Sequence, residues 1–238
     1  MRQLAYYLNE INNSTGSFNS ISYSELFKDT ALHIIPMVNP DGVTISQYGL
    51  KKIKKEETRN KITSIASNDK ASPEGNYLVQ WKSNANGVDL NRNFDALWSE
   101  YKGPAQASSD HYKGTAPGSE PESKALIELT TKYNVIRTIS YHTYGQVIYW
   151  YFGQTGQLYA STKKFADAIS ATTGYPTDAN YEKLDPAGYK DWAIHKLSIP
   201  SITIEVGHGS NPVPNSQFEQ IWNQNQHTWA AMLYDIKY

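Results

Sequence analysis

The order of apolar and polar residues predicts helices near both ends of the chain and in its second half. Near the beginning, apolar residues recur at helical spacing over 4–11, but no Ser, Thr, Asp or Asn precedes them as a cap, so the chain starts as if inside an element. A helix over 157–173 is expected to end at Gly174, because glycine readily adopts the left-handed conformation that stops a helix. Another helix is expected over 217–236, where Phe, Ile, Trp and Leu side chains form one apolar face.

Short apolar runs between these helices predict β-strands. The first of these runs ends at Asn39-Pro40-Asp41-Gly42, a sequence that favours a turn. The runs are residues 31–38, 135–140, 147–152 and 199–206. Because strands alternate with helices along the chain, we expect the α/β fold class, with a sheet layered against helices.

Polar stretches divide these elements into turns and loops. Residues 12–20 are expected to form a linker, and the Asn-Pro-Asp-Gly sequence at 39–42 a turn that ends the preceding strand. Residues 51–80 carry many charges without clear periodicity, which predicts a long surface loop. At 119–122, Ser-Glu-Pro-Glu has the form of a capping box and predicts a helix that continues to about Tyr133.

Composition narrows the classes of function. The chain has 238 residues, enough for a substantial core, and we expect a single domain over 1–238. With 22 Lys and Arg against 23 Asp and Glu, the formal net charge of -1 gives no whole-molecule attraction for nucleic acid or an anionic membrane. No run approaches the roughly 20 apolar residues of a membrane span, so a soluble chain is expected. Because cysteine is absent, His, Asp and Glu remain as metal ligands.

Polar side chains occur in four segments where a core strand or helix would be apolar. In the first, Asn91 and Arg92 follow an apolar residue directly, and the guanidinium suits a carboxylate with two parallel hydrogen bonds. The alternative is an arginine paired with a structural acid such as Asp89. In the second, Gly188 opens a helix with Lys190 near its start, and the alternative is an ordinary helix start with a solvated lysine.

The other two segments place ionisable side chains in strands. His142 lies at the end of a strand and before a glycine turn, where α/β sheets bind ligands, although a lone histidine is more often a structural residue. Glu205 stands among β-branched residues, and a carboxylate there is costly to bury unless it is paired or takes part in chemistry. Beside a metal-bound water, this carboxylate could act as a general base.

Several motifs follow one another along the chain, namely Asn39-Pro40-Asp41-Gly42, Asp89-Leu90-Asn91-Arg92-Asn93-Phe94, Tyr112-Lys113-Gly114 with Ser119-Glu120-Pro121-Glu122, His142-Thr143-Tyr144-Gly145 and Thr203-Ile204-Glu205-Val206-Gly207. Together they resemble the M14 zinc carboxypeptidase family, from about residue 1 to the end of the chain. Within that family they are most similar to the bacterial branch that cleaves γ-D-glutamyl-diamino acid bonds of cell-wall peptides.

The resemblance implies a fold and a set of roles. The fold would be a carboxypeptidase-like mixed β-sheet flanked by helices. His142 would be the third ligand of a zinc ion, and Glu205 the general base acting on the zinc-bound water. The substrate would be a peptide with a free carboxylate, and the location extracellular or at the cell wall if the parent carries a signal peptide.

The resemblance also implies how a substrate would be held. Asn91 and Arg92 would bind its terminal carboxylate. Tyr181 would close over the substrate. Lys190 would line the side-chain pocket, where a cation suits an acidic group such as that of diaminopimelate.

Two departures from the family pattern weaken this chemistry. The family's first two zinc ligands come from a His-x-x-Glu motif, but none of the six histidines is followed by Glu three residues later. One histidine cannot hold catalytic zinc, which takes three protein ligands and keeps a position for water. Asn86 stands where this branch has an arginine that polarises the scissile carbonyl, so one oxyanion donor is weakened.

Two hypotheses of different classes follow. In the first, the chain is part of a zinc metallopeptidase and begins late, at Met1, with the His-x-x-Glu motif and the first strands of the sheet upstream. It would then be inactive alone, and marginally stable because sheet edges are exposed. In the second, it is a non-catalytic module that binds peptides through Asn91 and Arg92 without cutting them. A serine hydrolase is disfavoured, because no Gly-x-Ser-x-Gly elbow occurs.

Overall fold

The computed structural model describes all residues, 1–238, and they form two compact units. Unit 1 consists of Met1–Pro36, Ile139–Ala179 and Ile202–Tyr238, and unit 2 of Met37–Thr138 and Asn180–Ser201. Each unit is thus assembled from segments that are distant in sequence. The single domain expected over 1–238 stays a prediction.

A four-stranded sheet belongs to unit 1, in the order β3-β6-β4-β5. Its strands are β3 (Thr138–Thr143), β4 (Val147–Tyr149), β5 (Thr177–Asp178) and β6 (Ser201–Val206). Strand β4 pairs in parallel with β5 and antiparallel with β6, so the sheet is mixed. The mixed sheet with flanking helices confirms the α/β prediction at this level.

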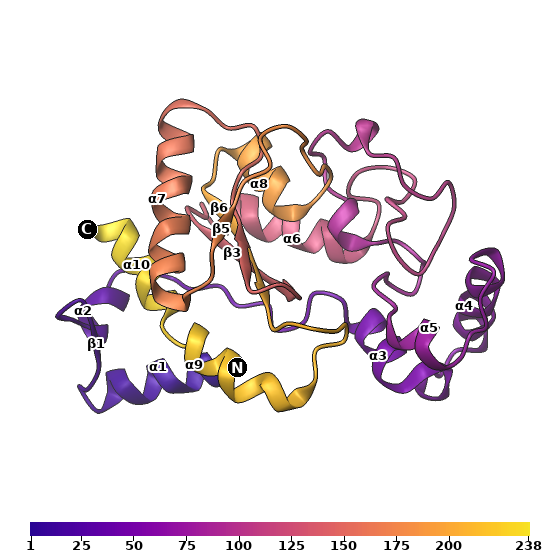
Figure 1. Cartoon of the computed structure of the whole chain (residues 1–238), viewed down its shortest axis with the longest axis horizontal. Coiled ribbons are helices and arrows are strands. Elements are labelled where there is room, and N and C mark those ends of the chain that lie inside the picture. Colours follow the sequence, from indigo (N-terminus) through magenta and orange to yellow (C-terminus); the bar gives the residue numbers. More distant parts are fainter. The chain divides into compact units, whose positions relative to one another are not determined.

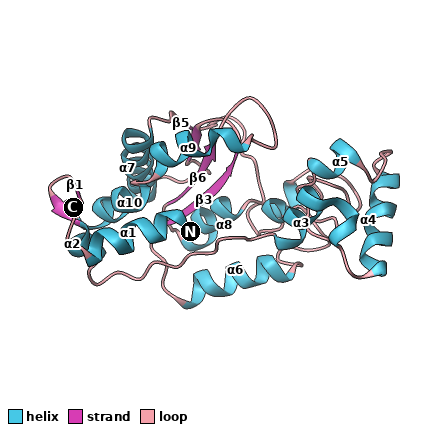
Figure 2. Cartoon of the chain, turned by 90° about the horizontal axis from the view of Figure 1, so that it is seen from below, coloured by secondary structure: helices cyan, strands magenta, loops and turns pink.

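Helices α7 (Gly156–Thr173) and α10 (Thr228–Lys237) lie side by side and pack on this sheet (Figures 1 and 2). Apolar side chains of both helices join those of β4 and β6 in one buried cluster, which includes Phe165, Ile169, Ala231, Ile148 and Ile204. As predicted, α7 ends at Gly174, which has a left-handed φ of 75°.

The helix predicted over 217–236 is two helices, α9 (Phe218–Asn225) and α10. The break follows from side-chain competition for one carbonyl group. The Asn225 carbonyl accepts hydrogen bonds from Thr228 Oγ1 and Gln3 Nε2, each at 2.9 Å. Such bonds offer the backbone an alternative to the helical ladder, so a continuous helix does not form.

The N-terminal helix α1 (Arg2–Asn12) has no side-chain cap, as predicted. Its buried Tyr7 contacts α10, where the Tyr7 hydroxyl accepts a hydrogen bond from the Ala230 N–H (3.1 Å). The linker predicted after α1 is instead partly ordered as the hairpin β1 (Ser17–Phe18) and β2 (Ile21–Ser22), followed by α2 (Tyr23–Phe27). Asn19 and Ser20 both have positive φ (47° and 65°), which suits the tight two-residue turn that joins such strands.

Residues 31–38, predicted as a buried strand, form no strand. Leu32 and Ile34 pack partly buried in unit 1, whereas Ile35, Met37 and Val38 are 41%, 52% and 39% exposed. A strand requires a neighbouring strand for its backbone hydrogen bonds, and the sheet offers this segment none. The strand prediction was therefore wrong here.

The boundaries of two other strands also differ from the prediction. Strand β3 begins at Thr138 instead of 135, where the Thr138 N–H donates to the Pro200 carbonyl (3.4 Å) ahead of β6. Strand β4 ends at Tyr149 instead of 152, because its partner β5 is only two residues long. Hydrogen bonding to neighbouring segments therefore determines where β3 begins and where β4 ends, and the apolar pattern of the sequence does not indicate these partners.

Unit 2 contains α3 (Pro40–Tyr48), α4 (Glu56–Asn68), α5 (Gly75–Val79), α6 (Pro121–Lys132) and α8 (Tyr189–Leu197), with short 3₁₀ turns between them. The surface loop predicted over 51–80 is wrong, because α4 and α5 fill most of it. The predicted turn at 39–42 is also wrong. Asn39 Oδ1 accepts a hydrogen bond from the Gly42 N–H (2.9 Å) and so caps α3.

Helices α3, α4 and α5 hold a small apolar cluster in unit 2, composed of Ile45, Ile62, Ile65, Leu78 and Trp81. Ile62 and Ile65 stand three residues apart on one face of α4, and apart from the buried Ala66 the rest of that helix is polar. Because so few apolar residues define this face, the charge-rich sequence hides a helix.

Helix α6 forms as predicted and ends at Lys132, but its cap differs from the predicted capping box. Glu120 is the N-terminal cap residue, with Pro121 in the first turn, and no side chain caps the helix. Ser119 Oγ instead donates to Glu120 Oε1 (2.8 Å).

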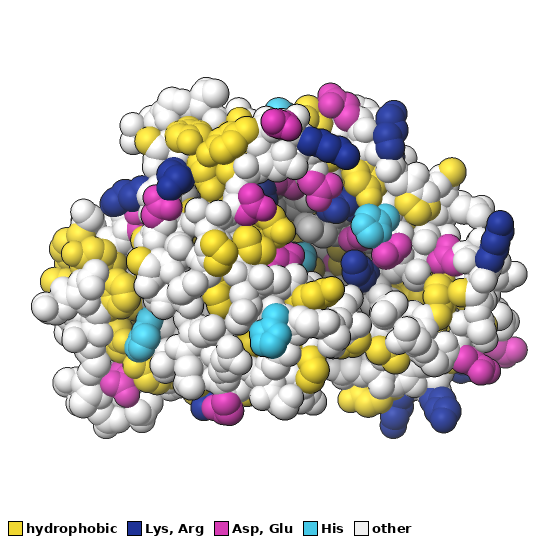
Figure 3. Space-filling view, viewed as in Figure 1, with side chains coloured by type: hydrophobic (Ala, Val, Ile, Leu, Met, Phe, Trp, Pro, Cys, Tyr) yellow, Lys and Arg dark blue, Asp and Glu magenta, His cyan; other side chains and the backbone are white.

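No helix of the structure has the length and apolar character needed to cross a bilayer. On the face shown in Figure 3, Lys and Arg side chains are interspersed with Asp and Glu, in keeping with the net charge of -1.

Candidate functional site

Asn91 and Arg92 lie in a short 3₁₀ turn, Leu90–Arg92, which Asp89 caps. Asp89 Oδ1 accepts a hydrogen bond from the Asn91 N–H (3.0 Å), and Asp89 Oδ2 accepts one from the His111 N–H (3.1 Å). Asp89 therefore orders the backbone of the turn. It is not the hydrogen-bonded partner of Arg92 that the alternative reading of this motif named.

The Arg92 side chain is only 14% exposed, and most of its polar atoms have partners. Nη2 donates to Asp185 Oδ2 (2.9 Å), and Nη1 donates to the Asn91 carbonyl (2.9 Å). The guanidinium carbon lies 5.1 Å from the centre of the Tyr101 ring. Nε, in contrast, is buried and has no hydrogen-bond partner. One strong donor of the fork is thus left for an acceptor.

Arg92 keeps its positive charge in this setting. Burial acts to lower the pKa of Arg92, but the carboxylates of Asp185 and Asp89 outweigh burial, so the pKa is raised from its ordinary value. A charged, nearly buried guanidinium can bind a carboxylate strongly, because surrounding water screens the interaction less than at the surface.

The same turn is tied to the start of α8. Asn91 Oδ1 accepts a hydrogen bond from the Tyr189 N–H (3.1 Å). A Cβ atom at Gly188 would lie 2.5 Å from Asp191 Oδ2 and 3.1 Å from Asn91 Oδ1, so this close approach requires glycine. The structure therefore brings Asn91 and Arg92 together with the Gly188 segment.

Lys190, predicted to line a substrate pocket, is buried beside Asp191. The two residues are 8% and 6% exposed, and Lys190 Nζ donates a short hydrogen bond to Asp191 Oδ1. Sequence reasoning did not name Asp191 as a partner. The solvated lysine offered as the alternative is wrong, because the Lys190 charge is buried and balanced by Asp191.

Residues 180–187 form the loop before α8, and this loop carries Tyr181 and Asp185. Tyr181 is 57% exposed. The loop is anchored at Ala187, whose N–H donates to the Ala96 carbonyl (2.8 Å) and whose carbonyl accepts from the Phe94 N–H (3.1 Å). Sequence reasoning missed Asp185, and the available signal was the Asp-Pro dipeptide at 185–186, which is typical of a turn.

His142 and Glu205 lie in unit 1, on the neighbouring strands β3 and β6. Both are partly buried. Glu205 pairs with Val147 of β4, and the Gly145 N–H donates to the Gly207 carbonyl (3.0 Å) where β6 ends. The predicted site residues thus fall into two sets, with His142 and Glu205 in unit 1 and Asn91, Arg92, Tyr181 and Lys190 in unit 2.

The residues of this chain do not fit a zinc ion. No three His, Asp or Glu side chains come together in the structure as a group that could hold a metal. Catalytic zinc takes three protein ligands, so His142 with Glu205 is insufficient. In the family pattern, the His-x-x-Glu motif that this sequence lacks would supply the other two ligands.

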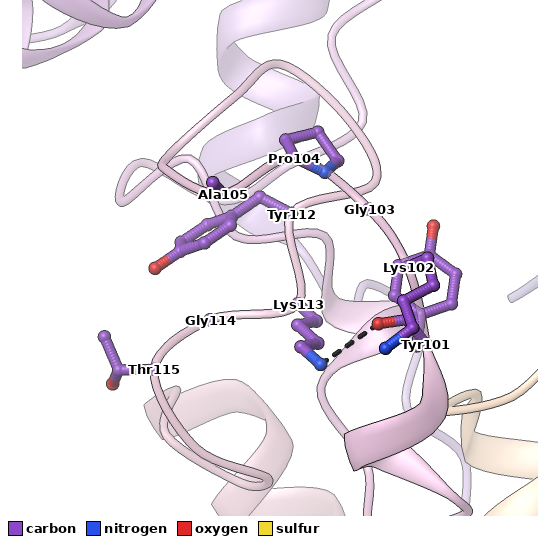
Figure 4. Close-up of a pocket in the computed structure, with 9 residues that line it drawn as sticks. All are labelled: Tyr101, Lys102, Gly103, Pro104, Ala105, Tyr112, Lys113, Gly114 and Thr115. Carbon is purple, nitrogen blue, oxygen red and sulfur yellow. Dashed lines mark hydrogen bonds between the residues drawn. The ribbon is translucent and has the colours of Figure 1, made fainter.

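A pocket of about 490 Å³ is present in unit 2, lined by two segments, residues 101–105 and 112–115 (Figure 4). Tyr101, whose ring lies against Arg92, is part of its wall. Lys113 Nζ donates to the backbone carbonyls of Trp98 (3.0 Å) and Tyr101 (3.1 Å), so this cation is fixed to the wall (Figure 4).

Asn86, which stands where an oxyanion donor was considered, is exposed and belongs to a hydrogen-bond network around the buried Glu120. Its Nδ2 donates to Glu120 Oε2 (2.8 Å), and its Oδ1 accepts from Lys61 Nζ (2.6 Å). Asn84 Nδ2 also donates to Glu120 Oε2 (2.8 Å). The side chain of Asn86 therefore orders its own loop.

Comparisons with known proteins agree with the motifs. Residues 3–228 match the family described as zinc carboxypeptidase, peptidase family M14. Gamma-D-glutamyl-L-diamino acid endopeptidase 1 of Lysinibacillus sphaericus is 34% identical over 230 residues, 96% of this chain and 55% of that protein. The uncharacterized protein YqgT of Bacillus subtilis (strain 168) is 33% identical over 221 residues, 91% of this chain and 56% of that protein. The chain thus spans about half the length of these curated relatives.

Solved structures agree with the fold. Bovine thrombin-activatable fibrinolysis inhibitor, in complex with tick carboxypeptidase inhibitor, matches with a TM-score of 0.55 at 24% identity, over 63% of this chain and 57% of that chain. Carboxypeptidase A from Helicoverpa armigera matches with a TM-score of 0.52 at 18% identity, over 63% of this chain and 43% of that chain. By its sequence and its carboxypeptidase-like fold, this chain belongs to the M14 zinc carboxypeptidase family.

Proposed function

We propose that this chain recognises peptides by a free carboxylate, and that Arg92 and Asn91 are the residues that hold this group. The observation that carries the proposal is the buried, charged guanidinium of Arg92, whose Nε donor has no partner. A buried donor without a partner costs free energy, and a ligand carboxylate would supply the missing acceptor. The turn capped by Asp89 fixes the direction of the fork before a ligand arrives.

The substrate class that we propose is peptides with a γ-D-glutamyl-L-diamino acid linkage. Support comes from the similarity to gamma-D-glutamyl-L-diamino acid endopeptidase 1 of Lysinibacillus sphaericus and from the motifs that both the family and this chain carry. Within this proposal, Tyr181 contacts the bound peptide from its exposed loop, and Lys190 with Asp191 forms a polar boundary of the site.

Residues 1–238 by themselves are not expected to hydrolyse this peptide. Zinc would supply an activated water in a complete family site, and His142 and Glu205 are the residues of this chain that we assign to that site as ligand and general base. Because the chain provides no group of three ligands, hydrolysis by these residues alone has no support.

A second candidate function is binding without cleavage. Asn86 favours it, because its amide is engaged with Glu120 and Lys61 and lacks the positive charge with which an arginine at this position would polarise a scissile carbonyl. In this case the turn Leu90–Arg92 with its cap Asp89, which we call the carboxylate-binding turn, would be the whole of the functional site.

The first test is calorimetric titration with γ-D-glutamyl-L-lysine and with the same dipeptide amidated at the lysine α-carboxyl, which is its terminal carboxylate. We expect the free acid to bind tighter than the amide, and Arg92→Lys to weaken binding of the acid about ten-fold, because lysine cannot form two parallel bonds. Arg2→Lys, the same substitution at an exposed residue of α1, serves as the control. Equal affinities of the acid for wild type and Arg92→Lys would refute the carboxylate assignment.

The second test is the zinc content of the purified, dialysed chain. We expect well under one zinc per chain and no release of lysine from the peptide when zinc is added. About one zinc per chain, lost in His142→Ala, would show that other residues complete the site and that the chain can be an enzyme by itself.

A further inference from the structure

We propose that Asp185 is an internal competitor for the carboxylate-binding arginine, so that a ligand must displace Asp185 in order to bind. The inference rests on the proposed function of Arg92. Asp185 would then determine specificity, because a ligand binds only if its interaction with Arg92 is more favourable than the ion pair between Arg92 and Asp185.

The geometry of the pair supports displacement. Asp185 Oδ2 meets Arg92 Nη2 at 2.9 Å, which is the position of one oxygen of a bound carboxylate. The Asp185 side chain is 72% exposed, whereas that of Arg92 is 14% exposed. Moving the Asp185 carboxylate from Arg92 into water therefore costs little free energy, while the charged guanidinium stays in place.

A ligand carboxylate can form more hydrogen bonds with Arg92 than Asp185 does. Asp185 engages Nη2 alone, and Nε remains without an acceptor. A ligand carboxylate that binds Nη2 and Nε side by side forms two parallel bonds. An amide or an ester lacks both the charge and the second equivalent oxygen, so it cannot match the bond with Asp185. Competition by Asp185 thus increases the preference for a free carboxylate.

The loop has the local structure that such an exchange requires. Ala187 is fully buried and held by two backbone hydrogen bonds, so the end of the loop near α8 stays fixed. Pro186 follows Asp185 directly and restricts the residue before it to extended conformations, which directs the Asp185 side chain. Tyr181 lies on the same loop, so release of Asp185 removes one restraint on the backbone that carries Tyr181.

The test compares two variants that each remove one negative charge from this loop, Asp185→Asn and Glu182→Gln. The affinity of the full chain for γ-D-glutamyl-L-lysine is measured by calorimetry. We expect Asp185→Asn to bind about two- to five-fold tighter than wild type, as the loss of one partly exposed ion pair implies. Glu182→Gln should bind like wild type. Without ligand, backbone amides of residues 180–185 should exchange hydrogen faster in Asp185→Asn.

Each other outcome overturns a defined claim. If Asp185→Asn binds like wild type while Arg92→Lys binds more weakly, Asp185 does not compete and the proposed function stands. If Glu182→Gln tightens binding as much as Asp185→Asn, the effect is general charge repulsion and the specific contact is refuted. If Arg92→Lys binds like wild type, the proposed function fails, and the role of Asp185 fails with it.

Discussion

Among single residues, Glu120 organises the loops that lead to the carboxylate-binding turn. It is 7% exposed and accepts hydrogen bonds from Asn84, Asn86 and Ser119. Burial acts to raise the pKa of Glu120, but these hydrogen bonds, with Lys61 nearby, lower the pKa below its ordinary value. The ionised form is therefore the one that the folded chain stabilises.

Glu120→Gln should lower the free energy of unfolding at pH 7 by about 1–2 kcal/mol, because an amide accepts these bonds less strongly than a carboxylate. A lowered pKa stabilises the fold above the ordinary carboxyl pKa of about 4.3, and this contribution is lost as the pH falls through the lower value. The difference between variant and wild type should therefore shrink between pH 7 and pH 3 in urea denaturation. Glu128→Gln, at an exposed position of α6, is the control, and a difference that persists at pH 3 would contradict the expectation.

Part of the candidate site was predictable at this scale. Asn91 and Arg92 stand out because they follow directly on an apolar residue, and the structure buries Arg92 as a charged group. The contacts of Arg92 with Tyr101 and Asp185 were not predictable, although the Asp-Pro dipeptide at 185–186 indicates a turn. The contact between Arg92 and Asp185 joins residues 93 positions apart, and nothing in the local sequence indicates it.

Among the elements, those with a local stop signal or a clear period were predicted well. Helix α7 ends at Gly174 because glycine takes the left-handed conformation there. The strand over 31–38 failed because strand formation depends on a partner elsewhere in the chain. Helix α4 was missed because only a few apolar residues on one face contact the cluster of unit 2.

Ile62→Ala tests whether α4 is held by this cluster. The side chain of Ile62 is fully buried among Ile45, Ile65, Leu78 and Trp81, so its truncation should cost about 2–4 kcal/mol of unfolding free energy. Chemical denaturation measures the loss. Ser64→Ala, at an exposed position of the same helix, should change stability by less than about 0.5 kcal/mol. Equal effects of the two substitutions would mean that residues 51–80 form the loop that the sequence suggested.

For the whole molecule, several large apolar side chains remain exposed to solvent. Ile35, Met37 and Val38 are exposed in a segment without strand pairing, and Ile136 is 51% exposed just before β3. Exposed apolar area contributes nothing to stability and promotes association.

We therefore expect residues 1–238 to be marginally stable, with a thermal midpoint below about 60 °C, within or under the usual mesophile range. Circular dichroism at several protein concentrations measures this midpoint and reveals association. A cooperative, concentration-independent transition above about 60 °C would show that the uncovered segment costs little.

The contact between α1 and α10 has a consequence for synthesis on the ribosome. The Tyr7 hydroxyl bonds to the Ala230 N–H across 223 positions, and Trp229 and Ala230 complete the cluster around Tyr7, Tyr23 and Leu26. At about 5–20 residues per second, the first helix emerges tens of seconds before its partner. During that interval residues 1–36 lack the α10 side chains that complete their cluster, and all of unit 2 is made before α10 emerges. Chaperone binding to the nascent chain should therefore concentrate on this early aromatic segment.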